Sequence, residues 1–339
     1  MTRLTVGVIG LGEMGRIHAR NLAALPTARL LAVASRRHET GQTVASALDV
    51  PRVYTDYQAL LADGDLEAVI IAANTSEHAE LIVAAAQARK AIFGEKPAAL
   101  TLDEMDRALE AVSAAGVPFQ IGFMRRFDPP YVAAKRQMED GGIGRPVAFL
   151  SISRDPCLPA PEDKSALARG NLFLDLGIHD YDLAGWLMGS RIVEVYATGG
   201  ALVYPQLHEF SDLDNAQVML RFADGAIGSI NLSRNARYGY DVRTEVLGSR
   251  GALHIGQLRQ VALDVLDGEG VHFQVYPWYQ ERFAAAYRLE MEHFVAHVRG
   301  QKAAQATGEE GRLALQTALA VTESFRHGRP VSLPGEGST

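Results

Sequence analysis

Two short segments combine residue types that can move a proton and hold a substrate oxygen. Asp175 and His179 stand one helical turn apart, and Asp182 follows three residues later. At about 100° per residue, these three side chains fall on one face of a predicted helix. An imidazole suits acid-base chemistry near neutral pH, and a carboxylate one turn away can orient its ring or bind a substrate hydroxyl. The second segment, 94–97, reads Gly-Glu-Lys-Pro, and its Lys96 can donate a hydrogen bond to a substrate oxygen.

Each segment also has a purely structural interpretation. Asp175 and His179 can form an ion pair on a helix surface, and Lys96 can be a solvated surface lysine. The elements that position these residues decide between the two interpretations, because a catalytic group needs a fixed place at a binding pocket.

A glycine-rich turn has the G-x-G-x-x-G spacing of a dinucleotide-binding loop, with Gly10, Gly12 and Gly15. It directly follows the apolar run 4–9 and opens a helical pattern at Glu13, the context that this mode of binding requires. Gly10 permits the tight turn, Gly12 lets a pyrophosphate approach the backbone, and Gly15 lets helix and strand pack closely. The helix N-terminus then supplies amide donors to the phosphates. The turn therefore predicts a dinucleotide cofactor.

The end of the second predicted strand indicates which dinucleotide is bound. Enzymes that use NAD commonly place an Asp or Glu there, which accepts hydrogen bonds from the adenine ribose. This chain has Ser35, Arg36 and Arg37 instead. A hydroxyl and two guanidinium groups suit a 2′-phosphate, so the sequence favours NADP over NAD. The alternative is that the two arginines form only a solvated turn.

The first third of the chain alternates apolar runs with helical patterns. This alternation predicts βαβ units and a parallel sheet that is covered on both faces by helices. Thr101 and Glu104 form a capping box at the start of the last helix in the series. We therefore predict that residues 1–122 form a doubly wound, NAD(P)-binding Rossmann domain. The expected strands are 4–9, 29–35, 68–73, 91–94 and 119–124, and the expected helices are 13–25, 40–48, 77–87 and 101–115.

The pattern changes after Phe123, where strand-like runs follow one another directly. Consecutive strands are typical of an antiparallel sheet, and Asp224-Gly225 between two of them signals a tight hairpin. Residues 123–339 are therefore predicted to form an α+β domain with a mostly antiparallel sheet. Its expected strands are 146–153, 192–199, 216–222, 226–232, 244–247, 260–266 and 271–275, with helices at 172–188 and 309–325.

Length and composition fit an enzyme of two domains. The chain has 339 residues, against roughly 150 per domain, with 47% hydrophobic and 22% charged residues. A formal net charge of −7 argues against nucleic acid or an anionic membrane as the main partner. The longest apolar run, 68–73, is far shorter than the ~20 residues of a membrane span, and no signal peptide is evident. With Cys157 as its single cysteine, the chain is predicted to be cytoplasmic.

Taken together, the motifs resemble those of the Gfo/Idh/MocA oxidoreductase family. The resemblance rests on the glycine turn with His18 three residues beyond it, on segment 94–97, and on the pair Asp175 and His179. It implies a Rossmann domain, a second α/β domain with an open sheet used for tetramerisation, and NAD(P)-dependent oxidation of a polyol.

Further segments narrow the resemblance to the inositol 2-dehydrogenase branch of that family. They are residues 122–128, residues 237–241, and Trp278 with residues 282–287. The resemblance then spans nearly the whole chain, and it implies a cyclic polyol of the myo- or scyllo-inositol type as the substrate of a homotetramer.

The resemblance also implies a role for each candidate residue. His179 would take the hydroxyl proton as hydride leaves the same carbon, Lys96 would polarise the oxygen, and Asp175 would orient substrate and His179. No metal is needed, and His18 and His78 lack convincing ligand partners. Binding of the other hydroxyls falls to Arg126, Asp155, Asp182 and Tyr238, beside the three catalytic residues. The cofactor residues would be Gly10, Gly12, Glu13, Met14, Gly15, Ser35, Arg36, Arg37, Asn74, Thr75, His78, Glu95 and Lys96.

Two departures from the family pattern keep alternatives open. Inositol dehydrogenases that use NAD have an acid where this chain has Ser35, so NADP is favoured with NAD also accepted. The segment from Cys157 to Asn171 is longer than expected and leads into the helix of Asp175, so it can remodel the pocket. A pyranose such as glucose is therefore the alternative substrate. A non-catalytic cofactor-binding regulator is the third interpretation, against which the joint presence of lysine, aspartate and histidine argues.

Overall fold

The computed structural model describes residues 2–157 and 171–334, so most of the segment predicted to be unusually long lies outside the described residues. Backbone contacts divide the chain into two compact units. Unit 1 comprises residues 1–127 and 285–315, and unit 2 comprises residues 128–284 and 316–339. Each unit is described by itself below.

Unit 1 contains a six-stranded parallel sheet with the order β3-β2-β1-β4-β5-β6. The strand order reverses between β1 and β4, as in doubly wound nucleotide-binding folds. Strands β1, β2, β4 and β5 consist mostly of buried apolar residues, as expected of a sheet covered by helices on both faces. The prediction of a doubly wound parallel sheet is therefore confirmed. The strands are β1 (Leu4–Ile9), β2 (Ala28–Ala34), β3 (Arg52–Tyr54), β4 (Ala68–Ile71), β5 (Ala91–Gly94) and β6 (Phe119–Ile121).

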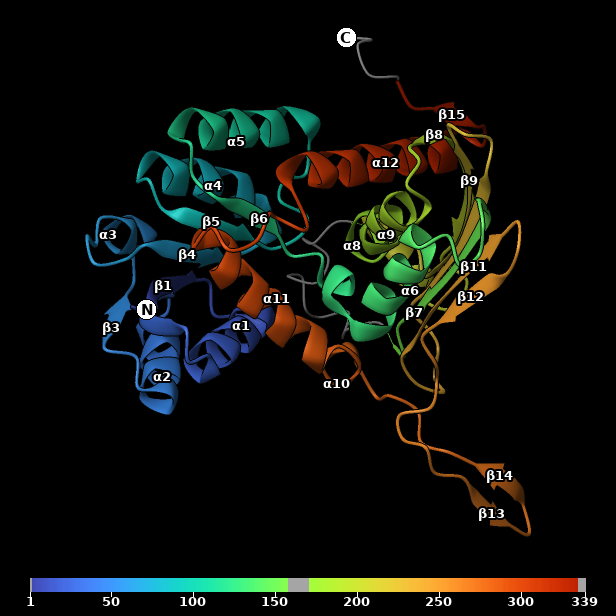
Figure 1. Cartoon of the computed structure of the whole chain (residues 1–339), viewed down its shortest axis with the longest axis horizontal. Helices are drawn as coiled ribbons and strands as arrows, with labels where there is room; N and C mark the ends of the chain where they lie inside the picture. Colours follow the sequence, from blue (N-terminus) through green and yellow to red (C-terminus); the bar gives the residue numbers. More distant parts are fainter. Residues whose placement is uncertain (1, 158–170, 335–339) are drawn as a thin grey trace. The chain divides into compact units, whose positions relative to one another are not determined.

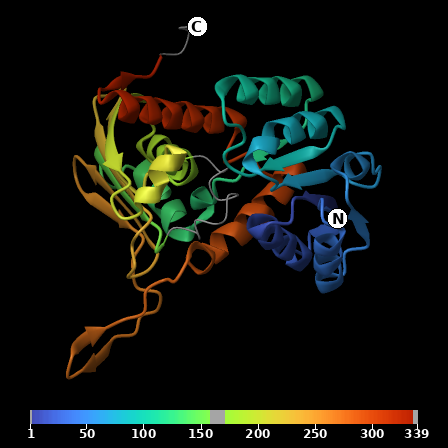
Figure 2. The ribbon, with the colours of Figure 1, turned by 180° about the vertical axis from the view of Figure 1, so that it is seen from behind.

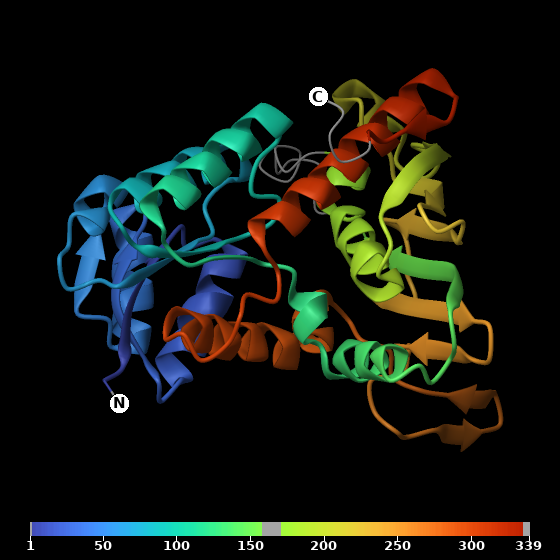
Figure 3. The same cartoon turned by 45° about the horizontal axis from the view of Figure 1, so that its top comes forward.

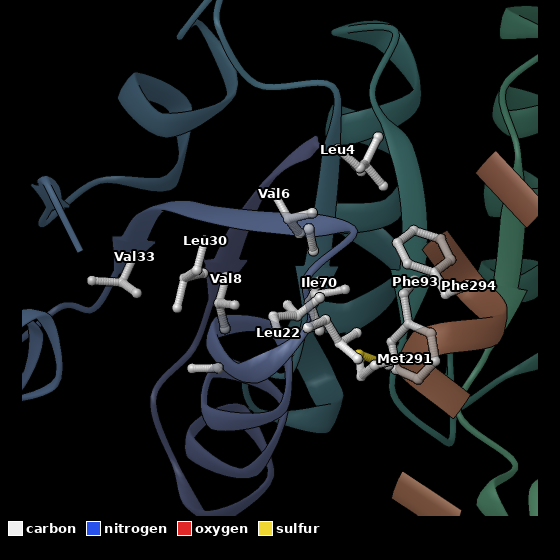
Figure 4. Close-up of a cluster of buried hydrophobic side chains, with 14 of the residues drawn as sticks. Leu4, Val6, Val8, Leu22, Leu30, Val33, Ile70, Phe93, Met291 and Phe294 are labelled. Atoms are coloured by element: carbon white, nitrogen blue, oxygen red, sulfur yellow. The ribbon is translucent and has the colours of Figure 1, made fainter. Parts of the chain in front are cut away.

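Figure 1 shows α4 and α5 on one face of this sheet and α1, α2 and α11 on the other. Figure 4 shows how α11 contributes to the core, where Met291 and Phe294 lie against Phe93 of β5 and near Leu22 of α1. Residues 285–298 thus belong to the nucleotide-binding unit although they stand far along the chain. The helices are α1 (Glu13–Ala24), α2 (His38–Leu48), α3 (Tyr57–Leu61), α4 (His78–Gln87), α5 (Leu102–Ala115) and α11 (Ala284–Val298), with 3-10 turns η1 (Thr75–Glu77) and η2 (Met124–Phe127).

Most elements expected in unit 1 are present, and their ends differ by a few residues. The capping box of Thr101 and Glu104 is formed at the start of α5. The sequence patterns did not predict β3, α3 or α11. The first two have only three and five residues, too few for a periodic pattern to emerge.

Unit 2 contains a seven-stranded mixed sheet with the order β12-β11-β7-β10-β9-β8-β15. All neighbouring pairs are antiparallel except β7 and β10, which run parallel. This confirms the predicted mostly antiparallel sheet, and Gly225 with φ of 87° forms the expected hairpin turn. The strands are β7 (Pro146–Arg154), β8 (Ile192–Gly200), β9 (Asn215–Phe222), β10 (Ile227–Ser233), β11 (Asp241–Gly248), β12 (Ala252–Ile255) and β15 (Val331–Ser332).

Helices cover one face of this sheet, and no helix of the described residues covers the other (Figure 3). The helical segments of unit 2 are α6 (Pro129–Glu139), α8 (Leu172–Asp175), α9 (Ile178–Met188), η3 (Pro205–Phe210), α10 (Tyr279–Arg282) and the second half of α12 (Gly308–His327). No helix among residues 2–157 and 171–334 is both long and apolar enough to cross a membrane.

The prediction of one helix over 172–188 is wrong, because α8 ends at Asp175 and α9 begins at Ile178. At the junction, the amide of Gly177 bonds five residues back to the carbonyl of Leu172, which interrupts the regular pattern. A Cβ on Gly177 would lie 2.6 Å from the hydroxyl oxygen of Tyr181, so the close packing there needs a glycine. Leu176 and Gly177 keep right-handed helical backbone angles, so the interruption lies in the hydrogen-bond pattern.

The strand pair expected over 260–275 is shorter than predicted. Continuous pairing is limited to β13 (Val265–Asp267) and β14 (Gly270–His272), with a separate antiparallel bridge between Arg259 and Val275, and the hairpin projects from the end of the unit 2 sheet (Figure 2). An isolated two-stranded ribbon buries little apolar surface, which limits the length over which it pairs.

Candidate functional site

The glycine turn has the geometry that its motif predicts. Gly10 adopts a positive φ of 90°, and a Cβ there would lie 2.5 Å from the carbonyl oxygen of Ala72, the residue after β4. A Cβ on Gly15 would lie 1.9 Å from the carbonyl oxygen of Gly10. Nothing lies within 4 Å of the Cβ position of Gly12. Gly10 and Gly15 therefore have no space for a side chain, whereas the turn is open toward solvent at Gly12.

The start of α1 leaves its amide donors available. Gly12 is the N-cap and has no side chain to bond to the first turn, which begins with Glu13 and Met14. Uncapped amides at a helix N-terminus suit a phosphate, and the crevice between β1 and β4 is where such sheets bind dinucleotides. Unit 1 therefore fits a dinucleotide cofactor.

The residues after β2 present basic side chains. Ser35 is half-buried, while Arg36 and Arg37 are exposed. Arg36 Nη1 lies 3.3 Å from Glu77 Oε1, and both side chains are solvent-exposed. Glu77 belongs to a capping box with Asn74 around η1, which includes Thr75. The Glu77 carboxylate thus lies beside Arg36, the residue assigned to the 2′-phosphate. The sequence patterns did not predict this contact.

The turn after β5 places Glu95 inside unit 1 and leaves Lys96 half-buried. Glu95 Oε1 accepts a hydrogen bond of 2.7 Å from His18 Nε2, and Glu95 Oε2 accepts one of 3.0 Å from the backbone amide of Lys96. Burial alone would raise the pKa of the Glu95 carboxyl, but the hydrogen bond from His18 and the charge of Lys96 hold it below its ordinary value. A Cβ on Gly122 would lie 3.2 Å from this carboxylate. The Glu95 side chain thus anchors the turn from within.

His78 links the same turn to the end of β4. Its Nδ1 lies 2.8 Å from the carbonyl oxygen of Pro97 and its Nε2 lies 3.1 Å from that of Ala73. Burial lowers the pKa of the His78 imidazole, which favours the neutral ring with one N–H group. The side chain of this predicted cofactor residue is buried and engaged with backbone carbonyls.

Arg126, which the sequence assigns to the substrate, lies in η2 with a buried guanidinium. Its Nη1 donates to the carbonyl oxygen of Gln305 at 2.7 Å and contacts Glu310 Oε1 at 2.5 Å. Burial alone would raise the pKa of the Glu310 carboxyl, but the Arg126 charge holds it below its ordinary value. The guanidinium thus has protein partners within unit 1.

Unit 2 positions Asp175, His179 and Asp182 through the junction of α8 and α9. Asp175 ends α8 and is partly exposed, whereas His179 and Asp182 lie in α9 and are 8% and 5% exposed. The next residue after His179, Asp180, faces the sheet, where its Oδ1 accepts hydrogen bonds of 2.6 Å and 2.8 Å from the hydroxyls of Ser151 and Ser153 in β7. These buried bonds fix α9 on the sheet.

Arg234 is a residue of this region that the sequence reading missed. Its Nη1 lies 2.6 Å from Asp212 Oδ2, and its Nη2 lies 3.6 Å from Asp175 Oδ2. Burial alone would lower the pKa of the Arg234 guanidinium, but the Asp212 and Asp175 carboxylates raise it above its ordinary value. A single Arg after a strand does not by itself indicate a functional residue. Its position next to the motif at 237–241 is the feature that could have identified it.

The other two predicted substrate residues of unit 2 are held by the ends of strands. The amide of Asp155 donates to the carbonyl of Ser233 at 2.9 Å, so the ends of β7 and β10 fix its place. The Tyr238 hydroxyl donates to Asp241 Oδ2 at 2.8 Å and accepts from Arg154 Nη1 at 3.1 Å. Burial raises the pKa of the Tyr238 hydroxyl, an effect that Asp241 increases and Arg154 opposes.

The predicted residues thus form two groups, one in each unit. Unit 1 brings together the glycine turn, the residues after β2 and the Lys96 turn, all at the carboxyl ends of its strands. Unit 2 brings together Asp155 and Asp175 around Arg234. Within residues 2–157 and 171–334, no group of three or more His, Cys, Asp or Glu side chains is arranged to hold a metal ion.

Comparison with known proteins identifies relatives over nearly the whole chain. The chain is 39% identical to scyllo-inositol 2-dehydrogenase (NAD(+)) of Bacillus subtilis, over 96% of this chain and 95% of that protein. It is 37% identical to myo-inositol 2-dehydrogenase of Thermotoga maritima, over 97% and 98%. Its structure matches that of scyllo-inositol dehydrogenase from Lactobacillus casei with bound NAD(H) and scyllo-inositol, with a TM-score of 0.93, 31% identity and coverage of 98% and 99%.

Family models account for both parts of the chain. Residues 4–123 match the oxidoreductase family model with an NAD-binding Rossmann fold, and residues 135–333 match the model of its C-terminal α/β domain. The resemblance seen in the sequence motifs is therefore confirmed, as is the predicted class of enzyme, an oxidoreductase. The chain belongs to the Gfo/Idh/MocA oxidoreductase family.

Proposed function

We propose that this chain is a dehydrogenase that oxidises a ring hydroxyl of an inositol or a closely related cyclic polyol, with NADP preferred over NAD. The observation that carries the proposal is the junction of α8 and α9, where Asp175 lies against the buried Arg234 and His179 opens α9. A carboxylate and an imidazole held on rigid elements suit proton transfer from a hydroxyl. The names of the relatives, which are inositol dehydrogenases, support the substrate class.

The proposed chemistry separates the proton from the hydride. A bound nicotinamide dinucleotide supplies the hydride acceptor. The His179 imidazole takes the proton from the substrate hydroxyl oxygen, and the Lys96 ammonium donates a hydrogen bond to the same oxygen, on which negative charge develops. Asp175 orients the substrate and the imidazole. In this proposal unit 1 contributes Lys96, and unit 2 contributes the acid-base pair.

We assign the remaining hydroxyls of the polyol to Arg126, Asp155, Asp182 and Tyr238. The fixed partners of Tyr238 and the burial of Asp182 support this assignment, because both side chains have restricted orientations. A site that pairs several hydroxyls at once rejects analogues that leave its polar groups unpaired. We therefore expect much lower kcat/KM for linear alcohols and 2-hydroxy acids than for cyclic polyols.

The preference for NADP is supported by the residues after β2. An acid there would repel a 2′-phosphate, and Ser35 removes that repulsion. Arg36 is paired with Glu77, but exposed ion pairs contribute only about 0–1 kcal/mol, so a phosphate can take the place of this partner. Relatives named for NAD use are compatible with acceptance of NAD as the second cofactor.

A panel assay tests the proposed function directly. The protein is incubated with NAD or NADP and with myo-inositol, scyllo-inositol, glucose, lactate and ethanol, and the absorbance of the reduced cofactor is followed. Turnover of an inositol above all other compounds is the expected result. Higher kcat/KM on glucose would identify a pyranose dehydrogenase, whose substrate ring presents similar equatorial hydroxyls. Cofactor binding without any turnover would favour a regulator.

The uncovered face of the unit 2 sheet supports a homotetramer. In one row across the sheet, Leu150 lies opposite Ser229, Ser229 opposite Met219, and Met219 opposite Tyr196. The three apolar side chains of this row are 39–50% exposed, and Ile227 beside it is 56% exposed. An apolar patch of this kind suits association with a second copy of the chain. Light scattering on Met219→Glu with Ile227→Glu should show smaller assemblies than the unmodified protein, and an unchanged mass would contradict this proposal.

A further inference from the structure

Among the residues that the structure describes, Arg234 is a buried cation that lies among acidic groups at the end of β10. The side chain of Arg234 is 6% exposed. Three carboxylates act on it, and they come from three elements: Asp155 after β7, Asp175 at the end of α8, and Asp212 before β9. With one cation against three anions, this group has a formal net charge of −2. Removal of the cation would leave the carboxylates to repel one another in a poorly solvated place.

Asp212 holds Arg234 in place through contacts with the protein. It is buried, its Oδ2 contacts Arg234 at 2.6 Å, and its Oδ1 accepts hydrogen bonds of 2.8 Å from the backbone amides of Leu172 and Leu213. Leu172 is the first residue of α8. Asp212 therefore connects the guanidinium to the start of the same short helix that ends at Asp175.

The backbone of Arg234 is fixed as well. Its amide donates to the carbonyl of Asp214 at 2.8 Å, and the preceding residue, Ser233, accepts from the amide of Asp155 at 2.9 Å. The guanidinium therefore has little freedom to follow Asp175 if that carboxylate moves. Arg234 Nη2 lies 3.6 Å from Asp175 Oδ2. This contact restrains Asp175, which is less buried than Asp212.

We propose that Arg234 is a positioning residue, which Asp212 holds and which in turn fixes the orientation and charge of the Asp175 carboxylate toward the substrate. The proposal rests on the proposed function, because it assumes that Asp175 orients a substrate hydroxyl and His179. It assigns different tasks to the two acids: Asp212 is a structural partner, and Asp175 is the group presented to the ligand.

A set of matched variants separates these tasks. Arg234→Gln alone should lower the melting temperature, because it leaves Asp212 buried without its cation. The double variant Arg234→Gln with Asp212→Asn removes that buried charge, so its melting temperature should return close to that of Asp212→Asn. Its kcat should nevertheless stay about 10- to 100-fold below that of Asp212→Asn, because a misplaced Asp175 disturbs the reacting geometry. Arg221→Gln, which breaks an exposed ion pair with Glu194 on the same sheet, should leave kcat unchanged.

Titration of Asp175 supplies a readout that does not depend on turnover. The carboxyl carbon of Asp175 is followed by NMR in protein with labelled aspartate, and Asp175→Asn provides the assignment. Loss of the neighbouring guanidinium should raise the pKa of Asp175 in the double variant relative to Asp212→Asn. It should also move the acid limb of the kcat profile to higher pH. In Arg234→Lys, which keeps a point charge without the planar fork, the pKa should rise less.

The two readouts distinguish failure of this inference from failure of the proposed function. If the double variant matches Asp212→Asn in both kcat and the pKa of Asp175, Arg234 has only a structural role and the inference is wrong. If the unmodified protein oxidises no polyol, the proposed function is wrong, while the titration of Asp175 still decides whether Arg234 fixes its charge.

Discussion

The two units bury carboxyl groups in opposite ways. In unit 2, the Arg234 guanidinium lies within 4 Å of both Asp175 and Asp212, so these acids have a cation beside them. In unit 1, Glu95 has a hydrogen bond from His18, and Glu290 of α11 is fully buried without a hydrogen-bond partner among the described residues. Burial and the nearby Glu95 raise the pKa of Glu290 well above its ordinary value.

The difference lies in the groups that each acid contacts. The unit 1 acids face inward, where Glu95 holds the backbone of the Lys96 turn and one negative charge is enough. Unit 2 keeps Asp175 partly exposed at the end of a helix, where a charged acceptor can meet a ligand. Glu95, which supports a backbone turn, has a pKa held below its ordinary value, whereas Glu290, without a hydrogen-bond partner among the described residues, has a raised pKa. A nearby donor or cation therefore decides which buried acid keeps its charge.

The largest expected effect tests whether both units take part in the chemistry. His179→Ala in unit 2 and Lys96→Ala in unit 1 should each lower kcat by roughly 10²- to 10⁴-fold, since each removes a group that acts on the reacting oxygen. His179→Ala should change cofactor affinity little, because His179 is not among the residues assigned to the dinucleotide. Steady-state kinetics at saturating cofactor provide the measurement. A His179→Ala enzyme that keeps half of its kcat would exclude this residue as the base.

The cofactor preference tests whether unit 1 also recognises charge. One charge-assisted hydrogen bond contributes roughly 1.5–3 kcal/mol, less when exposed, which corresponds to about a 10- to 100-fold preference for NADP. Ser35→Asp with Arg36→Val should reverse the preference, because it restores a ribose acceptor and deletes a guanidinium. The measurement is kcat/KM for NAD and NADP in both proteins. A clear preference of the unmodified protein for NAD would mean that residues 35–37 form only a solvated turn.

The glycine turn tests recognition by the backbone alone. Gly12→Ala adds a methyl group in open space, so the protein should fold with an unchanged melting temperature. The same methyl group would occupy the approach of the pyrophosphate, so the KM for the dinucleotide should rise about tenfold, equivalent to ~1.4 kcal/mol. Gly64→Ala, which also meets nothing within 4 Å, is the matched control in the same unit. Equal KM values for the two variants would mean that Gly12 does not line the phosphate site.

The smallest effect concerns the stability of unit 1. In the folded protein, the raised pKa of Glu290 keeps its carboxyl group protonated. In the unfolded protein, the same group loses its proton above its ordinary pKa of 4.5. The free energy of unfolding therefore falls as the pH rises from 4.5 toward the raised pKa. Glu290→Gln removes this proton uptake. Its melting temperature should therefore increase relative to the unmodified protein as the buffer changes from about pH 5 to about pH 8.

A matched substitution controls for the change of an acid to an amide on α11. Glu292 is partly exposed and pairs with Arg288, so Glu292→Gln removes an acid from the same helix without touching the core, and its melting temperature is measured beside that of Glu290→Gln at each pH. A pH-independent difference for Glu290→Gln would show that Glu290 is not held neutral in the folded protein.

Local patterns explain how much of the fold could be predicted. The turn at Gly10 to Gly15 was predictable because its glycine spacing follows from short-range geometry: Gly10 and Gly15 leave no space for a side chain, and Gly12 leaves the turn open. The parallel sheet was predictable because strands buried on both faces are continuous apolar runs. The helix over 172–188 was wrong because its interruption depends on the packing of Gly177 against Tyr181, which periodicity does not reveal.

The sequence by itself determined the class of fold, the place of the dinucleotide turn and the residues that could move a proton, because these depend on residue type and short spacing. Only the tertiary structure decided which charges act on one another. Arg234 contacts Asp212 and Asp175, and His18 contacts Glu95, across 22, 59 and 77 positions of the chain. Electrostatic interactions depend on distance in space and on burial, and neither quantity can be read from separations along the chain.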